Sequence, residues 1–252
     1  MTIGPSARAT VRERLRTMLP RAVLRRLRPG STPTVGRVDF GDLRRTRPIS
    51  GDFGFDRGLP IDRYYIERFL AARADDIRGR VLEVDDASYT RRFGGSRVTR
   101  SDVLHVHEGA PEATIVGDLA SADHVPSDAF DAIVLTQTLH LIYDVRAAIA
   151  TLHRILAPGG VLLATVPGIS PIDRTEWKDT WFWALTEQSA RRLFEERFAE
   201  SVVDVKGHGN VLAAVAFIEG IASEELSQPE LDVVDASYPV CIAIRAVKPD
   251  GA

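Results

Sequence analysis

The sequence contains a single cysteine, Cys241, which lies in a strongly apolar segment. One cysteine cannot form a disulfide within the chain, and no cluster of residues with metal-ligand spacing surrounds it. We therefore expect a buried, inert thiol, no metal site, and a protein suited to the reducing cytoplasm.

Long apolar runs and an excess of positive charge are also missing. No uninterrupted apolar stretch approaches the roughly 20 residues that span a bilayer. The N-terminus also lacks the apolar core and cleavage site of a signal peptide. The net charge of −3 argues against a nucleic-acid binder that depends on overall positive charge.

Positive charge is instead concentrated at the N-terminus, where residues 1–30 hold eight arginines and one acid, Glu13. Apolar residues between the arginines are typical of a basic amphipathic helix that lies on an anionic membrane or grips a partner protein. The alternative is a loose arm, because Pro20 would interrupt a helix. We therefore predict a basic arm and linker over residues 1–50 and a folded domain over residues 51–252.

Strand and helix patterns alternate through the first part of this domain. Helices are predicted over 61–74 and 145–156, and strands over 81–84, 98–101, 113–116, 131–135 and 161–166. This alternation predicts an α/β fold with a parallel, doubly wound sheet.

The last part of the chain differs from this pattern. Helices are predicted over 189–198 and 211–221, and strands over 201–206 and 239–247. Consecutive strands late in the chain favour an antiparallel pair that completes the sheet. No internal repeat and no second core is present, so one domain is expected.

Three segments between residues 78 and 168 follow one another in a specific order. They are a strand that ends in an acid (81–84, VLEV), a strand with the loop after it (130–140, FDAIVLTQTLH), and a proline-glycine-glycine turn before a strand (154–167). Together they resemble class I methyltransferases that use S-adenosylmethionine (SAM), in particular the methyltransferase type 11-like branch. The resemblance implies a Rossmann-like fold with a mostly parallel seven-stranded sheet, an antiparallel C-terminal strand pair, and SAM as cofactor.

The loop that follows the first strand departs from this family. The family has glycines at alternate positions here, which let the backbone approach the methionine end of SAM. In this chain Asp85, Ala87 and Tyr89 occupy those positions. Asp85 and Asp86 would place negative charge near the cofactor's carboxylate unless they point away or pair with its ammonium group. Two interpretations stay open: a divergent loop in a working methyltransferase, helped by Gly94-Gly95, or a fold that no longer methylates.

The other cofactor contacts follow from strand ends. Asp102 lies 19 residues after Glu83, close to the separation at which an acid meets ribose hydroxyls; the alternative is a solvated acid in a turn. Residues 118–119 resemble the family's adenine contact, and residues 136–137 follow the fourth strand at the edge where ligands bind. The predicted cofactor-binding residues are Glu83, Asp85, Asp102, Asp118, Leu119, Thr136 and Gln137.

A methyl transfer needs alignment and, for a hydroxyl acceptor, a base. His140 is the predicted base because it lies near the end of the fourth strand and has an unperturbed pKa near 6.5. Tyr143 is close enough in sequence to orient it. The alternative is that His140 packs against or caps the following helix.

Two segments are candidates for the acceptor site. The three tryptophans fall in one stretch after the fifth strand, where aromatic faces suit a ring or a sugar, or form a hydrophobic lid. A second lining precedes the first strand. The predicted substrate-binding residues are Arg63, Tyr64, Tyr65, Trp177, Trp181 and Trp183.

The leading hypothesis is therefore SAM-dependent methylation of an oxygen or nitrogen atom of a small metabolite or sugar in a biosynthetic setting. The expected partner is a small-molecule acceptor rather than nucleic acid, with membrane or protein contact only through the basic arm. Two alternatives remain: the same fold performing a cyclisation or elimination, or a noncatalytic partner subunit. The oligomeric state does not follow from the sequence.

Overall fold

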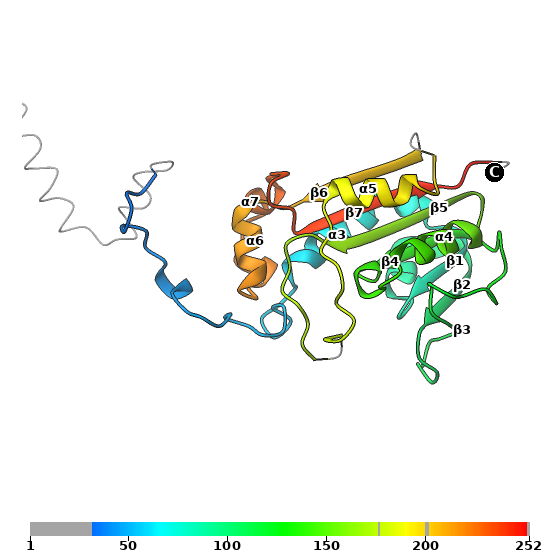
Figure 1. Cartoon of the computed structure of the whole chain (residues 1–252), viewed down its shortest axis with the longest axis horizontal. Coiled ribbons are helices and arrows are strands. Elements are labelled where there is room, and N and C mark those ends of the chain that lie inside the picture. Colours follow the sequence, from blue (N-terminus) through cyan, green and yellow to red (C-terminus); the bar gives the residue numbers. More distant parts are fainter. Residues whose placement is uncertain (1–31, 176, 200–201, 251–252) are drawn as a thin grey trace, which may run out of the picture. The chain divides into compact units, whose positions relative to one another are not determined.

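The computed structural model describes residues 32–175, 177–199 and 202–250 (Figure 1). The chain divides into two units, residues 1–44 and 45–252. The basic arm predicted over residues 1–30 lies outside the described residues. The second unit begins before residue 51, the predicted start, because the backbone N–H groups of Ile49 and Ser50 donate to the carbonyl of Glu219.

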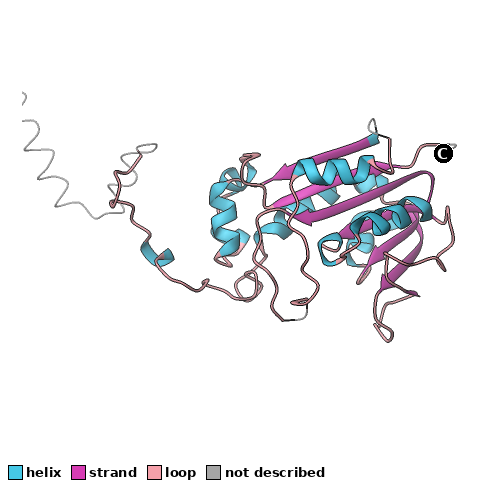
Figure 2. Cartoon of the chain, in the orientation of Figure 1, coloured by secondary structure: helices cyan, strands magenta, loops and turns pink. Residues whose placement is uncertain are grey.

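Seven strands form one sheet in the order β3-β2-β1-β4-β5-β7-β6 (Figure 2). Strands β1 to β5 pair in parallel, and β7 runs antiparallel between β5 and β6. Their bounds are β1 Gly79–Val84, β2 Val98–His105, β3 Ile115–Val116, β4 Phe130–Thr136, β5 Leu156–Pro167, β6 Val203–His208 and β7 Cys241–Val247. The predicted doubly wound, mostly parallel sheet with an antiparallel C-terminal pair is confirmed.

Helices cover both faces of this sheet because its strands are apolar on both sides. Ile133 and Leu135 of β4 belong to one core cluster, whereas Ala132 and Val134 belong to the other, since successive residues of a strand face opposite sides. The first cluster includes residues of α4 and α5, and the second includes residues of α3, α6 and α7. The helices are α3 Ile61–Ala72, α4 Val145–Ile155, α5 Glu187–Glu195, α6 Val211–Ile218 and α7 Gln228–Asp232. Cys241 is fully buried in the second cluster, and burial raises the pKa of its thiol.

Polar side chains fix where three of these helices begin. The carboxylate of Asp144 accepts the N–H of Ala147 at the start of α4, and Thr186 accepts the N–H of Ser189 at the start of α5. Asn210 accepts two backbone N–H groups at the start of α6. Each of these bonds satisfies donors that the first turn of a helix leaves free.

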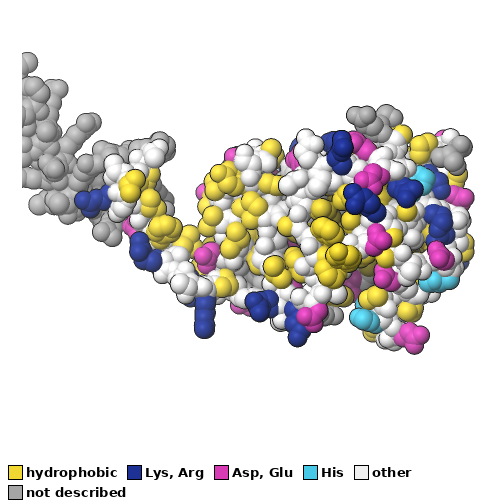
Figure 3. All heavy atoms as spheres, viewed as in Figure 1, with side chains coloured by type: hydrophobic (Ala, Val, Ile, Leu, Met, Phe, Trp, Pro, Cys, Tyr) yellow, Lys and Arg dark blue, Asp and Glu magenta, His cyan; other side chains and the backbone are white. Residues whose placement is uncertain are grey.

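Helix α6 is apolar on its outward side as well as its inward one. Its exposed residues are Val211, Leu212, Val215 and Ile218, and apolar side chains gather over this part of the molecule in Figure 3. The helix has only eight residues. Among the described residues, no helix is both long and apolar enough to cross a membrane.

The second strand is longer than its sequence pattern predicted. We expected it to end at Ser101, but β2 continues to His105 because Val84 of β1 pairs with Leu104. Val103 and Leu104 are buried in the sheet. This difference moves Asp102 from the predicted strand end into the strand.

Candidate active site

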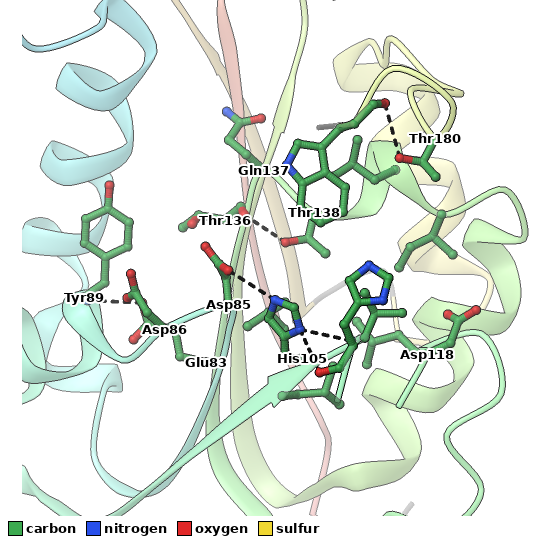
Figure 4. A pocket seen from close by; sticks show the side chains of 18 of the residues that line it. Glu83, Asp85, Asp86, Tyr89, His105, Asp118, Thr136, Gln137, Thr138 and Thr180 are labelled. Carbon is green, nitrogen blue, oxygen red and sulfur yellow. Dashed lines mark hydrogen bonds and ion pairs between the residues drawn. The ribbon is translucent and has the colours of Figure 1, made fainter. Parts of the chain in front are cut away.

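A cavity of about 950 Å³ opens where β1, β2 and β4 end. In open α/β sheets ligands bind outside the carboxyl ends of the strands, and this volume lies in the range of small-molecule sites. Residues of α3 and of the segment between β5 and α5 complete its wall. In the view of Figure 4, Glu83 and Asp118 lie on opposite sides of the cavity, with Asp85 and His105 between them.

The loop after β1 (residues 85–89) contains no glycine, yet Asp85 has the backbone conformation that the expected glycine would adopt. Asp85 has a φ of 82°, in the left-handed region that glycine adopts freely and that aspartate tolerates better than most residues. Its N–H donates to the carbonyl of Leu104 at 3.1 Å, which fixes it beside the end of β2. The carboxylate of Asp85 is 78% exposed and lines the cavity. Replacing the expected glycine with Asp85 therefore adds a negative charge to this wall, and the cavity remains open.

The carboxylate of Glu83 holds this loop in place through hydrogen bonds. Its carboxylate accepts the backbone N–H groups of Tyr89 at 3.1 Å and Thr90 at 2.7 Å, and the residue is only 3% exposed. Burial raises the pKa of Glu83 to about 7, although its hydrogen bonds with Thr90 and Tyr89 act in the opposite direction. Glu83 lines the cavity, with its carboxylate oxygens turned to the loop.

The prediction that Asp102 ends the second strand, where it would meet a ribose, is wrong about where the strand ends. Asp102 lies within β2, does not line the cavity, and pairs with Arg80 at 2.7 Å and Arg100 at 3.0 Å. Burial would raise the pKa of this carboxyl, but the hydrogen bonds and charges of the two arginines outweigh it and lower the pKa below its usual value. Asp102 is thus part of an ion-pair cluster that joins β1 to β2.

The remaining predicted cofactor residues line the cavity. Asp118 is exposed at its wall, with Oδ1 accepting the N–H of Ala120 at 2.8 Å, and Leu119 lies next to it. Thr136 is the last residue of β4 and Gln137 follows it. Gln137 has a φ of 47°, and its side-chain Nε2 is buried without a hydrogen-bond partner among the described residues. An unpaired buried donor of this kind is costly unless a ligand pairs with it.

His140 does not line the cavity, which corrects its assignment as the base. Its ring is 2% exposed and lies edge-on to Trp181, with 4.3 Å between the ring centroids. Neither ring nitrogen has a partner among the described residues, and burial lowers the pKa of His140 to about 4. Tyr143, the other predicted catalytic residue, does line the cavity and is largely exposed.

The two predicted substrate-binding segments each contribute only part of their residues. Trp177 lines the cavity, whereas Trp181 stacks on Phe53 and Trp183 donates its Nε1–H to the carbonyl of Ile142 at 3.0 Å. Trp181 and Trp183 therefore hold the segment between β5 and α5 against the fold, as a lid would.

Upstream of β1, Arg63 lines the cavity, but Tyr64 and Tyr65 do not. The Tyr64 hydroxyl donates to Asp232 at 2.6 Å, and the Tyr65 hydroxyl donates to the carbonyl of Leu231 at 3.0 Å. Both tyrosines therefore join α3 to α7, and the assignment of Tyr64 and Tyr65 to the substrate is corrected.

Sequence reasoning missed several cavity residues. His105 is the last residue of β2 and His107 follows it, Phe182 lies in the tryptophan segment, and Phe55 precedes α3. The only signal for the two histidines was their alternation with apolar residues. Among the described residues, no group of three or more His, Cys, Asp or Glu side chains is arranged to hold a metal ion.

A family model for the methyltransferase domain matches residues 53–203, which is more than half of the chain and includes β1 to β5 with the cavity. The chain belongs to the methyltransferase domain family. Among curated proteins, no sequence matches it significantly.

The fold agrees with that of a solved methyltransferase. A SAM-dependent methyltransferase from Archaeoglobus fulgidus aligns with a TM-score of 0.50 at 12% identity, covering 74% of this chain and 94% of that one. One from Mesorhizobium loti has a TM-score of 0.49 at 19% identity, covering 71% and 95%. The [4+2]-cyclase SpnF has a TM-score of 0.49 at 18% identity, covering 75% and 82%.

The ion-pair cluster around Asp102 should contribute to stability and not to ligand binding. We expect Asp102→Asn to lower the free energy of unfolding by about 2 kcal/mol at pH 7, because it weakens charged hydrogen bonds in a buried site. The pKa of Asp102 is lowered in the folded protein, so its contribution is present above pH ~4 and is lost as the pH falls. Urea unfolding at pH 7 and pH 3 measures this, and an equal loss at both pH values would contradict it.

Glu83 should make stability decline with rising pH. Its pKa is raised in the folded protein, so the folded state binds the proton more tightly than the unfolded chain. The stability that this proton gives is present below pH ~4 and lost as the pH rises to about 7. In thermal unfolding, the advantage of the natural protein over Glu83→Gln should be larger at pH 5 than at pH 8. A constant difference would show that Glu83 does not titrate in this range.

The enclosed ring of His140 should be replaceable by an apolar side chain. His140→Leu removes two unpartnered buried nitrogens, so we expect an unchanged or raised melting temperature. A drop of several degrees would mean that the imidazole has a polar partner in solution.

Proposed function

We propose that this chain is a SAM-dependent methyltransferase that acts on an oxygen or nitrogen atom of a small metabolite or sugar. The observation that carries the proposal is the cavity at the ends of β1, β2 and β4, in a chain of the methyltransferase domain family. Its wall includes carboxylates, which can accept hydrogen bonds from the adenosine and attract the positive charge of SAM, and aromatic rings, which can pack against an acceptor.

The cavity residues fit the cofactor at more than one point. Asp118 and Leu119 would meet the adenine, with the carboxylate as acceptor for its amino group. When bound, SAM supplies an electrophilic methyl group on a positively charged sulfur. A wall that includes Asp85 and Asp86 favours a ligand with positive charge.

Aromatic side chains on the other part of the wall would hold the acceptor. Trp177, Phe182 and Tyr143 line the cavity, and the rings of Tyr143 and Phe182 meet edge to face at 5.3 Å between centroids. Such faces suit a flat ring or the apolar face of a sugar and exclude water. Because the methyl donor carries its own leaving group, the work of these residues is chiefly alignment of the nucleophile.

Calorimetric titration with SAM and with S-adenosylhomocysteine tests this function. We expect both to bind, and Asp118→Ala to weaken binding at least about tenfold, because a charged hydrogen bond is lost. Asp123→Ala, in the same loop but outside the cavity, should bind as the natural protein does.

Two outcomes separate the alternatives. Failure of the natural protein to bind either compound would overturn the proposal and favour a noncatalytic partner subunit. Binding of SAM, with turnover that yields no methylated product, would favour a cyclisation or elimination on the same fold.

A further inference from the structure

Two departures from the expected cofactor site lie next to each other in space. The loop after β1 has Asp85 where a glycine is expected, and β2 ends in His105 where an acid is expected to meet the ribose. The Nε2 atom of His105 lies 3.7 Å from Oδ1 of Asp85 (Figure 4). Asp85 places a carboxylate at this edge of the sheet, and His105 stands where a carboxylate is expected.

The orientation of the His105 ring suits a carboxylate neighbour. Its Nδ1 contacts both the backbone N–H and the carbonyl oxygen of His107, at 3.0 Å and 3.1 Å, and this leaves Nε2 facing Asp85. The His105 side chain is only 17% exposed and is therefore held in place, whereas that of Asp85 is 78% exposed in the cavity.

The Asp85 carboxylate keeps most of its capacity to accept hydrogen bonds. Among the described residues His105 is its one side-chain partner, and a carboxylate has about four acceptor sites. Asp102 has little such capacity left, because Arg80, Arg100 and Thr114 already donate to its oxygens. Asp85 is thus the carboxylate with free acceptor sites beside the end of β2.

We infer that Asp85 replaces the acid expected at the end of β2 and accepts the ribose hydroxyls of an adenosine ligand, with His105 orienting its carboxylate. This inference rests on the proposed function. It accounts for both departures together, since an acid is present in the loop beside the strand end that lacks one. The backbone of Asp85 permits this because it already has the left-handed φ of the expected glycine.

Binding of S-adenosylhomocysteine and of its 2′-deoxy and 3′-deoxy analogues tests the inference. For the natural protein we expect at least one deoxy analogue to bind about tenfold or more weakly. Asp85→Asn should lose about tenfold in affinity for S-adenosylhomocysteine and most of the preference for ribose. His105→Gln should lose less affinity and keep the preference, because it only orients the carboxylate.

A charge relocation gives the sharpest comparison. Asp85→Gly should bind weakly, and adding His105→Asp to it should restore the affinity to within a few-fold of the natural protein. Glu108→Gln removes the same charge from an exposed position outside the cavity and is the matched control. Circular dichroism and melting temperatures establish that each variant is folded.

The failures are distinguishable. If the natural protein binds no S-adenosylhomocysteine, the proposed function fails and this inference fails with it. If it binds but Asp85→Asn retains the full ribose preference, or the relocated acid restores nothing, the inference alone is overturned. A loss of affinity that is equal for ribose and deoxyribose ligands would assign Asp85 to the ligand's positive charge instead and would also overturn it.

Discussion

The buried carboxylate of Glu83 holds the loop on which the cavity depends. It accepts the backbone N–H groups of Tyr89 and Thr90, so the loop turns back over the end of β1. A short π-helical turn, Thr90–Gly94, then leads the chain to β2. Side chains in place of glycines are tolerated because hydrogen bonds to a fixed acid, rather than glycine flexibility, determine the shape of this loop. The ends of β1 and β2 can then face the same space.

Much of the fold could be predicted from the sequence because its signals are local. The apolar runs of β1, β4 and β5 and the helical period of α4 depend only on which residues face the core. The end of β2 could not be predicted in this way, because it is set by pairing of Leu104 with Val84 on the adjacent strand. Asp102 interrupted the apolar pattern and was mistaken for the end, although Val103 and Leu104 continue the strand.

The candidate site was predictable where the backbone alone positions a residue. Asp85 and Gln137 directly follow strands and Thr136 ends one, and parallel strands bring their carboxyl ends to one edge of the sheet. Side chains in long segments were not, because tertiary partners choose their direction. Trp181 turns inward to meet Phe53 and His140, and the hydroxyl of Tyr65 reaches α7. Spacing along the sequence carries no information about such partners.

The glycine-like backbone of Asp85 also bears on how this loop diverges between related proteins. A left-handed residue that aspartate and glycine both accept is a position where one can replace the other without any movement of the chain. Charge at the cavity wall can therefore change during evolution while the loop, the strand ends and the cavity stay as they are. A pattern search that requires glycine would pass over such a protein, although the geometry that glycine serves is still present.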